Sequence, residues 1–231
     1  MIRVENVTKS FPVPDGGELK ALDRVSLRVA AGELVSVVGP SGSGKSTLLF
    51  AMGGLAAPDS GEVYLADARV YALDASARAA LRRTEVGFVF QTFNLVPYLS
   101  CRENVALPAL LAGRGKAEAM AAADRVLERL GLAARSRHRP AQLSVGERQR
   151  VGIGRSLVNG PKVLLADEPT GNLDPAAADQ VMALFRELNA GGQTIVMVTH
   201  DPRLAEQASR IVRIAAGAVE EDRETARRRA S

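Results

Sequence analysis

Residues 39–46 read Gly-Pro-Ser-Gly-Ser-Gly-Lys-Ser, the pattern G-x-x-x-x-G-K-S, and they follow the apolar run 34–38. A strand, a glycine-rich loop and a helix in this order predict a phosphate-binding loop. The loop's N–H groups can turn inward around phosphates, and the helix N-terminus adds partial positive charge. Lys45 is expected to reach the β- and γ-phosphates and Ser46 to bind Mg²⁺. A glycine-rich turn without a ligand is the alternative, but the pattern is too rare by chance to favour it. The chain is therefore expected to bind a nucleoside triphosphate.

The composition is that of a folded globular chain. It has 231 residues, 46% of them hydrophobic, which is enough for one substantial core and a smaller subdomain. No run of eighteen apolar residues occurs and the first residues show no leader pattern, so we expect a chain that neither spans a membrane nor is exported. The single cysteine, Cys101, cannot form an internal disulfide and suits a reducing cytoplasm.

The charges do not indicate a nucleic-acid surface. Thirty Lys and Arg residues are interspersed with 26 Asp and Glu residues, for a formal charge of +4. With no Trp, three Tyr and six Phe, few aromatic rings are available to stack on bases. The one concentrated basic run, residues 227–229, follows the acidic residues 220–222. We interpret it as part of a polar tail, with a contact to membrane headgroups as the alternative.

The apolar pattern predicts an α/β fold. Alternating apolar residues within segment 2–29 predict antiparallel strands with one buried face. Residues 97–157 carry apolar side chains at helical spacing, which predicts a helical insertion. The runs 34–38, 163–166 and 194–198 are almost continuously apolar, and helical segments separate them. This alternation is typical of a parallel sheet covered on both faces.

Four polar side chains that follow predicted strands are expected to lie beside the phosphate loop. Asp167 and Glu168 stand at the carboxyl edge of a strand, where ligands bind in open α/β folds. Asp167 suits the support of Mg²⁺ and Glu168 suits a general base that polarises water, with an ordinary acidic surface as the alternative. His200 can donate a hydrogen bond to the γ-phosphate. Gln91 can reach Mg²⁺ or the attacking water through its amide oxygen.

The segment 143–147, Leu-Ser-Val-Gly-Glu, predicts the start of a helix. Ser144 and Glu147 form the capping-box pattern S-x-x-E, which leaves free N–H groups at Val145 and Gly146. A helix N-terminus with a hydroxyl group and a glycine amide can bind an anion. Ordinary capping without a ligand is the alternative on this segment alone.

The order of these motifs resembles that of the ATP-binding subunit of an ABC transporter, over essentially the whole chain from residue 2 to about 219. The resemblance implies a P-loop NTPase fold, with a mixed, mainly parallel core sheet, an N-terminal antiparallel β subdomain and an inserted helical subdomain. The chain is then a single domain, 1–231, in which residues 1–91 and 158–220 form the nucleotide-binding core. Residues 92–157 form the helical subdomain and residues 221–231 a polar tail.

The resemblance also implies roles for individual residues. The implied catalytic residues are Lys45, Gln91, Glu168 and His200, and the implied metal ligands are Ser46, Gln91 and Asp167. The implied nucleotide-binding residues are Phe11, Gly39, Pro40, Ser41, Gly42, Ser43, Gly44, Lys45, Ser46, Thr47, Ser144 and Gly146. Phe11 corresponds to the ring that stacks on adenine, with a core phenylalanine as the alternative. Residues 171–174 correspond to the loop through which two copies touch.

ATP, Mg²⁺ and two protein partners follow from the resemblance. ATP bound by the phosphate loop of one copy is expected to be capped by Ser144 and Gly146 of a second copy, in a head-to-tail homodimer. The subunit is expected to power a separate membrane permease, and to lie in the cytoplasm on the inner face of the cell membrane through that permease. No nucleic acid is expected. Phe93, Leu95 and residues 98–104 are candidates for the docking surface, with core packing as the alternative.

Within the family, residues 88–95, 103–105 and 166–174 most resemble the lipoprotein-release and macrolide-export branch, the LolD and MacB type. Two residues depart from the usual signature L-S-G-G-Q, since Val145 replaces the first glycine and Glu147 replaces the glutamine. Ser144 and Gly146 are retained, so we expect activity to survive. A carboxylate at Glu147 is expected to weaken ATP-driven closure.

Three classes of function are compared. The favoured one is the energy-coupling ATPase of a transporter. The second is an ATPase that regulates a membrane partner by transmembrane signalling without transport, which the sequence does not separate from the first. The third is a soluble ABC ATPase that acts on DNA or ribosomes. That class typically carries a long coiled-coil insertion or two ATPase units, and this sequence has neither.

Overall fold

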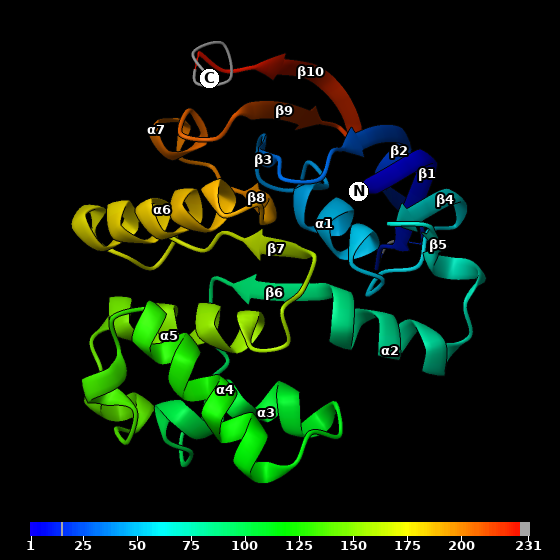
Figure 1. The fold of residues 1–231 in the computed structure, drawn as a ribbon. Coiled ribbons are helices and arrows are strands. Elements are labelled where there is room, and N and C mark those ends of the chain that lie inside the picture. The colour runs from blue at the N-terminus through cyan, green and yellow to red at the C-terminus, as the bar shows by residue number, and fades with distance from the viewer. Residues whose placement is uncertain (15, 227–231) are drawn as a thin grey trace.

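A computed structural model describes residues 1–14 and 16–226 and shows two sheets with helices around them (Figure 1). The larger sheet has six strands in the order β10-β9-β3-β8-β7-β6. Its bounds are β3 (Leu34–Val38), β6 (Val86–Phe90), β7 (Val163–Asp167), β8 (Thr194–Val198), β9 (Arg210–Ala215) and β10 (Ala218–Glu224). Five neighbouring strands, in the order β9-β3-β8-β7-β6, pair in parallel, and β10 pairs antiparallel to β9. The predicted mixed, mainly parallel sheet is therefore confirmed.

The smaller sheet is antiparallel throughout, as predicted for the N-terminal part. Its order is β2-β1-β4-β5, with bounds β1 (Ile2–Pro12), β2 (Glu18–Val29), β4 (Ser60–Leu65) and β5 (Ala68–Arg69). Val4 pairs with Leu27 and with Val63 on its two sides, and all three are buried. The alternation of apolar residues that predicted these strands therefore faces one core.

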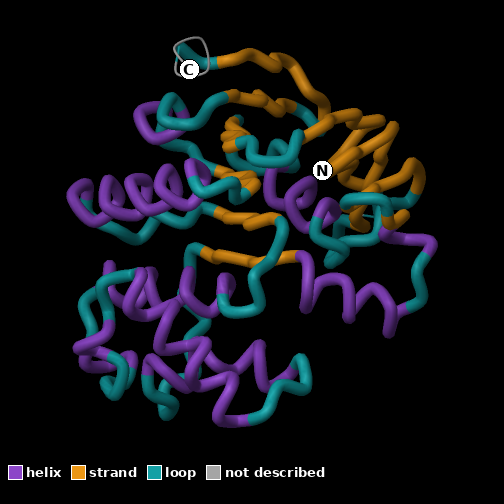
Figure 2. Tube along the Cα trace, viewed as in Figure 1, coloured by secondary structure: helices purple, strands orange, loops and turns teal. Residues whose placement is uncertain are grey.

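Most helices lie against the sheets or in a separate helical layer, which Figure 2 shows as a purple region away from the strands. The α-helices are α1 (Lys45–Met52), α2 (Ala75–Glu85), α3 (Cys101–Leu111), α4 (Lys116–Arg129), α5 (Val145–Leu157), α6 (Pro175–Ala190) and α7 (Pro202–Ala205). Short 3₁₀ turns are η1 (Val70–Ala72), η2 (Ala133–Arg135) and η3 (Pro140–Gln142). The helical layer consists of α3, α4 and most of α5, within the segment predicted as a helical insertion.

Three apolar clusters hold these layers together. The first fills the space between the two sheets and includes Leu48 and Leu49 of α1, while the second lies between the larger sheet and α6. Adjacent strand residues take opposite sides: Leu165 belongs to the first cluster and Leu164 to the second. The third cluster holds the helical layer together. Because α5 contributes Ile153 to the second cluster, the helical layer is joined to the face of the sheet opposite α1.

The sequence did not predict α2 or the last two strands. Helix α2 buries none of its residues, and apart from its alanines Leu81 is its one apolar side chain, so its apolar stripe is too weak to mark a helix in the sequence. Strand β10 lies at the edge of the sheet with charged, exposed residues from Glu220 onward. It extends four residues into the segment 221–231 that we expected to be a polar tail, because backbone pairing with β9 does not require apolar side chains. The basic run 227–229 lies outside the described residues.

A buried asparagine holds the irregular segment that precedes α3. Asn104 is fully buried, its Oδ1 accepts from the Val96 N–H at 2.8 Å, and its Nδ2 donates to the carbonyls of Val96 and Leu99, both at 3.1 Å. Cys101 is equally buried, whereas Tyr98 is 72% exposed. The prediction that residues 98–104 form a docking surface is therefore wrong for Cys101 and Asn104, whose side chains are buried.

Replacing Asn104 with alanine is expected to destabilise the fold by about 2–3 kcal/mol, because several buried backbone groups lose their partner. Urea unfolding followed by circular dichroism measures this change. The control is Arg102→Ala on the same helix. Arg102 forms an exposed ion pair with Asp124, so its loss should change stability by less than about 1 kcal/mol. Equal stability of the two variants would show that Asn104 does not hold the loop.

Candidate functional site

The phosphate loop connects β3 to α1 at the junction of the two sheets. Gly39 and Gly44 have φ angles of 153° and 102°. A Cβ atom on Gly39 would lie 2.0 Å from the carbonyl oxygen of Ile214 in β9, and one on Gly44 would lie 2.1 Å from that of Ala21 in β2. These positions therefore accept only glycine, both for conformation and for space. The glycines that mark this loop in the sequence are therefore also the residues that its packing against β9 and β2 requires.

The loop presents donors that suit a phosphate. Helix α1 begins at Lys45 after Gly44, and no side chain caps its first N–H groups. The Lys45 side chain is 8% exposed, and its Nζ donates to the carbonyls of Gly39 at 2.9 Å and Pro40 at 2.7 Å. Within the described residues the buried Ser43 hydroxyl has no hydrogen-bond partner. Uncapped amides, a buried ammonium group and an unpaired hydroxyl fit an anionic ligand with several oxygens.

Ser46 and Asp167 meet directly beside the loop. The Ser46 hydroxyl donates to Oδ1 of Asp167 at 2.8 Å, which joins the first turn of α1 to the end of β7. Burial raises the pKa of the Asp167 carboxyl, and the hydrogen bond from Ser46 partly opposes this rise. Because a hydroxyl oxygen and a carboxylate oxygen converge here, the pair fits a hard cation that completes its shell with phosphate oxygens and water.

Glu168, one residue after β7, and His200, two residues after β8, form a second pair. The His200 Nδ1 and the Glu168 Oε2 are 2.9 Å apart, and the Glu168 N–H donates to the Val198 carbonyl at 3.1 Å. Glu168 has a φ of 47°, the left-handed region that a residue other than glycine rarely adopts. Strained backbone is concentrated at functional sites, where the surrounding structure holds it. The predicted general base and the predicted γ-phosphate contact thus lie together at the sheet edge.

Gln91 lies against the turn 171–172. Its Nε2 donates to Oδ1 of Asn172 at 3.3 Å, and the Asn172 amide donates back to the Gln91 carbonyl at 3.1 Å. In the described residues the Gln91 side chain therefore bonds Asn172 and not the Ser46–Asp167 pair. This contact joins the residue after β6 to the loop predicted to touch a second copy.

Sequence reasoning missed one buried side chain near this turn. Gln149 of α5 is fully buried, and its Nε2 donates to the Pro169 carbonyl at 2.6 Å. It ties α5 to the residue that follows Glu168. Its spacing in α5 is that of an ordinary helical residue, so only the three-dimensional contact distinguishes it.

Ser144 and Gly146 lie elsewhere in the molecule. The predicted capping box is confirmed, since the Glu147 N–H donates to the Ser144 hydroxyl at 3.2 Å and the Ser144 N–H donates to Glu147 Oε2 at 2.8 Å. These residues begin α5, which packs in the second and third apolar clusters, whereas α1 packs in the first. Figure 1 shows α5 in the helical layer and α1 beside the antiparallel sheet. The chain therefore carries two groups of predicted ligand residues on separate elements.

Phe11 is exposed at the end of β1. The exposed fraction of its side chain is 41%, and the Lys9 ammonium lies 5.4 Å from the centre of its ring. The alternative of a core phenylalanine is therefore wrong. An open aromatic face on a strand suits stacking with a flat ligand.

Comparison with known proteins identifies the class. The family model described as ABC transporter matches residues 22–171, and the chain belongs to that family. The chain is therefore an ABC ATPase domain. The MacB proteins of Chromobacterium violaceum and Burkholderia thailandensis, named macrolide export ATP-binding/permease proteins, are 44% and 46% identical over 96% of this chain and 34% of their own length. The chain thus spans about a third of the length of these curated relatives.

Solved structures agree with this assignment. The ATP-binding cassette MJ0796, in a dimeric post-hydrolysis state bound to ADP and phosphate, is 41% identical with a TM-score of 0.89 over 97% of this chain and 98% of that one. The structure of cbiO1 from Clostridium perfringens, part of the ABC transporter complex cbiONQ, is 28% identical with a TM-score of 0.86 over 100% and 90% of the two chains. The predicted fold, and the resemblance to the macrolide-export branch, are confirmed.

Among the described residues, no helix has the length and apolar character needed to cross a membrane.

The raised pKa of Asp167 leads to a prediction about stability. Burial destabilises the ionised carboxyl in the folded protein, and this penalty is complete above the raised pKa and vanishes as the pH falls towards the usual value of 3.8. At pH 7, Asp167→Asn is therefore expected to raise the melting temperature of the nucleotide-free protein. The same variant should lose most of the further rise that Mg²⁺ and ATP produce.

Differential scanning calorimetry with and without Mg²⁺ and ATP tests both parts. The matched control is Asp67→Asn, which removes an exposed carboxylate and should leave both melting temperatures within about 1–2 °C of the wild type. A lower melting temperature for nucleotide-free Asp167→Asn would contradict the burial penalty.

Proposed function

We propose that this ATPase drives a membrane permease by closing and reopening a head-to-tail dimer of two such cassettes. The observation that carries this proposal is the separation of the two groups of ligand residues. The phosphate loop lies at the junction of the sheets, whereas Ser144 and Gly146 begin a helix joined to the opposite face of the larger sheet. One chain therefore supplies the phosphate loop of one site and the helix start of another. The structures of MJ0796, described as dimeric, give a precedent for a dimer of two such cassettes.

ATP binding begins at the loop. The N–H groups of residues 41–47 and the Lys45 ammonium group bind the β- and γ-phosphates, and Phe11 stacks on adenine. Lys45 exchanges its bonds to the Gly39 and Pro40 carbonyls for bonds to phosphate oxygens. Ser144 and Gly146 of the second copy then donate to the γ-phosphate, so that ATP joins the two subunits.

Ser46 and Asp167 are the residues that would hold Mg²⁺. Gln91 would reach the ion once its side chain breaks the hydrogen bond to Asn172. When bound, the ion supplies positive charge that stabilises the phosphoryl group during transfer. Lys45 and the loop amides act on the same negative charge, and they are already positioned when ATP arrives.

Glu168 acts on the attacking water. Its carboxylate accepts a proton from the water as the oxygen bonds to the γ-phosphorus, and the bond from that phosphorus to the ADP oxygen breaks. His200 holds the carboxylate through Nδ1 and can turn to the γ-phosphate. Loss of the γ-phosphate then removes the ligand shared by the two subunits, and the dimer reopens.

Glu168→Gln is expected to retain ATP binding, to lose at least about 100-fold in turnover and to accumulate an ATP-dependent dimer. Size-exclusion chromatography with light scattering, with and without Mg²⁺ and ATP, measures the dimer, and phosphate release measures turnover. Adding Ser144→Arg to this variant should abolish the dimer while monomeric ATP binding persists. Undiminished hydrolysis in Glu168→Gln would remove this residue from the role of general base.

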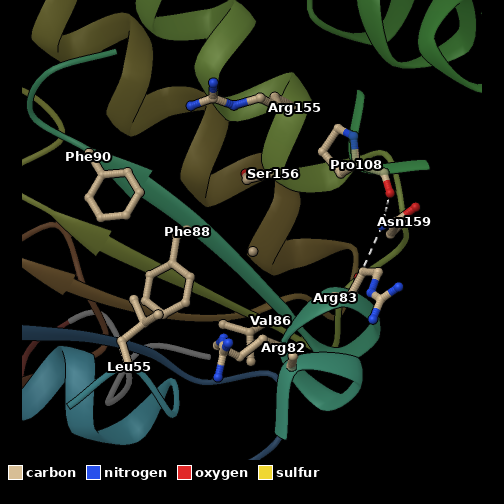
Figure 3. A pocket seen from close by; sticks show the side chains of 12 residues that line it. Leu55, Arg82, Arg83, Val86, Phe88, Phe90, Pro108, Arg155, Ser156 and Asn159 are labelled. Carbon is tan, nitrogen blue, oxygen red and sulfur yellow. Dashed lines mark hydrogen bonds between the residues drawn. The ribbon is translucent and has the colours of Figure 1, made fainter. Parts of the chain in front are cut away.

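The permease partner is proposed to dock in a groove beside the helical layer (Figure 3). The groove has a volume of about 400 Å³ and lies between α2, β6, α3 and α5. Its wall includes the stacked rings of Phe88 and Phe90, with centroids 5.8 Å apart, and the half-exposed side chain of Leu55. An apolar groove of this kind accepts the apolar face of an amphipathic helix. The names of the MacB relatives, which join an ATP-binding part to a permease, support a permease segment as the occupant.

Three arginines give the groove a positive charge. Arg82 donates to the Gly54 carbonyl, Arg83 to the Leu111 carbonyl and Arg155 to the carbonyls of Phe93 and Asn94. Each guanidinium group thus binds backbone carbonyls, which leave its net charge uncompensated. Charge complementarity therefore favours a permease segment with acidic side chains beside its apolar face. Such a contact places the cassette at the inner face of the membrane.

Leu55→Glu is expected to reduce co-purification with the permease at least about tenfold, because it places a negative charge among the apolar groups of the groove. Hydrolysis of ATP by the cassette without its permease should not change. The control Ala190→Glu adds the same charge at an exposed site at the end of α6. Equal co-purification of both variants would show that the permease binds elsewhere.

A further inference from the structure

The carboxylate of Glu147 has defined partners in the helix start that carries Ser144. Its Oε2 accepts from the Ser144 N–H at 2.8 Å, and its Oε1 accepts from Nε of Arg135 at 3.0 Å. The side chain of Glu147 is 18% exposed and that of Arg135 is 47% exposed. The hydrogen bond from the Ser144 N–H and then the bond and charge of Arg135 hold the pKa of this carboxyl below its usual range. Glu147 is therefore ionised and fixed in one orientation.

The same contacts hold the Ser144 hydroxyl in place at the helix start. Its oxygen accepts from the Glu147 N–H at 3.2 Å, and the hydroxyl also interacts with the Glu147 carboxylate, where it adds to the lowering of the pKa. A hydroxyl that is fixed as an acceptor on one side can donate on the other to a phosphate oxygen. Gly146, between Ser144 and Glu147, adds a backbone N–H in the first turn of α5.

An ionised carboxylate at this place presents an electrostatic problem. Glu147 lies one helical turn from the hydroxyl that is proposed to meet the γ-phosphate, and two negative groups at such separation repel each other. Arg135 comes from η2, a separate segment twelve residues earlier, and brings a positive charge into direct contact with the carboxylate.

We propose that Arg135 is a positioning residue that neutralises Glu147 and so allows this helix start to close on the triphosphate of a second copy. With its charge neutralised by Arg135, Glu147 repels the triphosphate no more than an uncharged side chain at position 147 would. Arg135 also holds the carboxylate on the Ser144 amide, which maintains the orientation of the Ser144 hydroxyl. This inference rests on the proposed composite site.

The test compares Arg135→Gln, Glu147→Gln and the double variant, each in the Glu168→Gln background that stabilises the dimer. The ATP concentration at half-maximal dimer formation is measured by light scattering at low and high salt. Arg135→Gln should weaken closure about threefold to fivefold at each site, and so about tenfold or more for a dimer with two sites. The double variant should close as well as Glu147→Gln alone, and high salt should reduce the effect of Arg135→Gln.

The matched control is Arg137→Gln, which removes one positive charge at an exposed position two residues away and should close like the parent. Melting temperatures and ATP affinities of the monomers are measured in parallel. An effect of Arg135→Gln that persists in the double variant would reduce Arg135 to a structural role, and normal closure of Arg135→Gln would overturn the inference. If the Glu168→Gln parent itself forms no dimer with ATP, the composite site fails instead.

Discussion

The close approach of the phosphate loop to the backbone of both sheets is the constraint on which this structure depends. Gly39 lies against a carbonyl of β9 and Gly44 against a carbonyl of β2, with no space for a side chain at either position. The Gly217 N–H also donates to the Ser43 carbonyl at 3.1 Å. The loop is thus fixed from two directions before any ligand arrives. Everything that acts on the phosphates is placed relative to this fixed loop, because α1, β7 and β8 meet it at the same edge.

The polar side chains of the site lie in hydrogen-bonded pairs that a ligand can rearrange. Lys45 is held by carbonyls of its own loop, and the buried Asp167 accepts from Ser46. Glu168 contacts His200, and Gln91 contacts Asn172. Each pair satisfies polar groups that would otherwise be unpaired, and each has a partner that the triphosphate or its cation can replace. A ligand can therefore bind by exchanging these hydrogen bonds.

The core strands could be predicted because burial on both faces leaves a signature in the sequence. The runs 34–38 and 194–198 are apolar at nearly every position, and the helix cap at Ser144 follows from residues only three apart. Strand β10 gave no such signal, since backbone pairing and ion pairs such as that of Asp222 with Arg210 stabilise this exposed edge strand without apolar side chains. The hydrogen bonds by which Asn104 holds the segment before α3, and the contact of Gln149 with Pro169, also could not be predicted. They join segments that only the folded chain brings together, and no local pattern specifies them.

Two copies together make each ATP site in the proposed function, and complementation between two inactive variants can test this. Glu168→Gln protein keeps an intact Ser144, and Ser144→Ala protein keeps an intact phosphate loop and Glu168. In a mixed dimer, one site therefore combines the phosphate loop and Glu168 of the Ser144→Ala protein with Ser144 of the Glu168→Gln protein. All of these groups are wild-type. Phosphate release is measured for each protein alone and for mixtures with excess Ser144→Ala protein. The account predicts that the mixtures hydrolyse ATP faster than the sum of the two proteins measured separately. Activities that merely add, at concentrations where the wild-type protein is active, would contradict it.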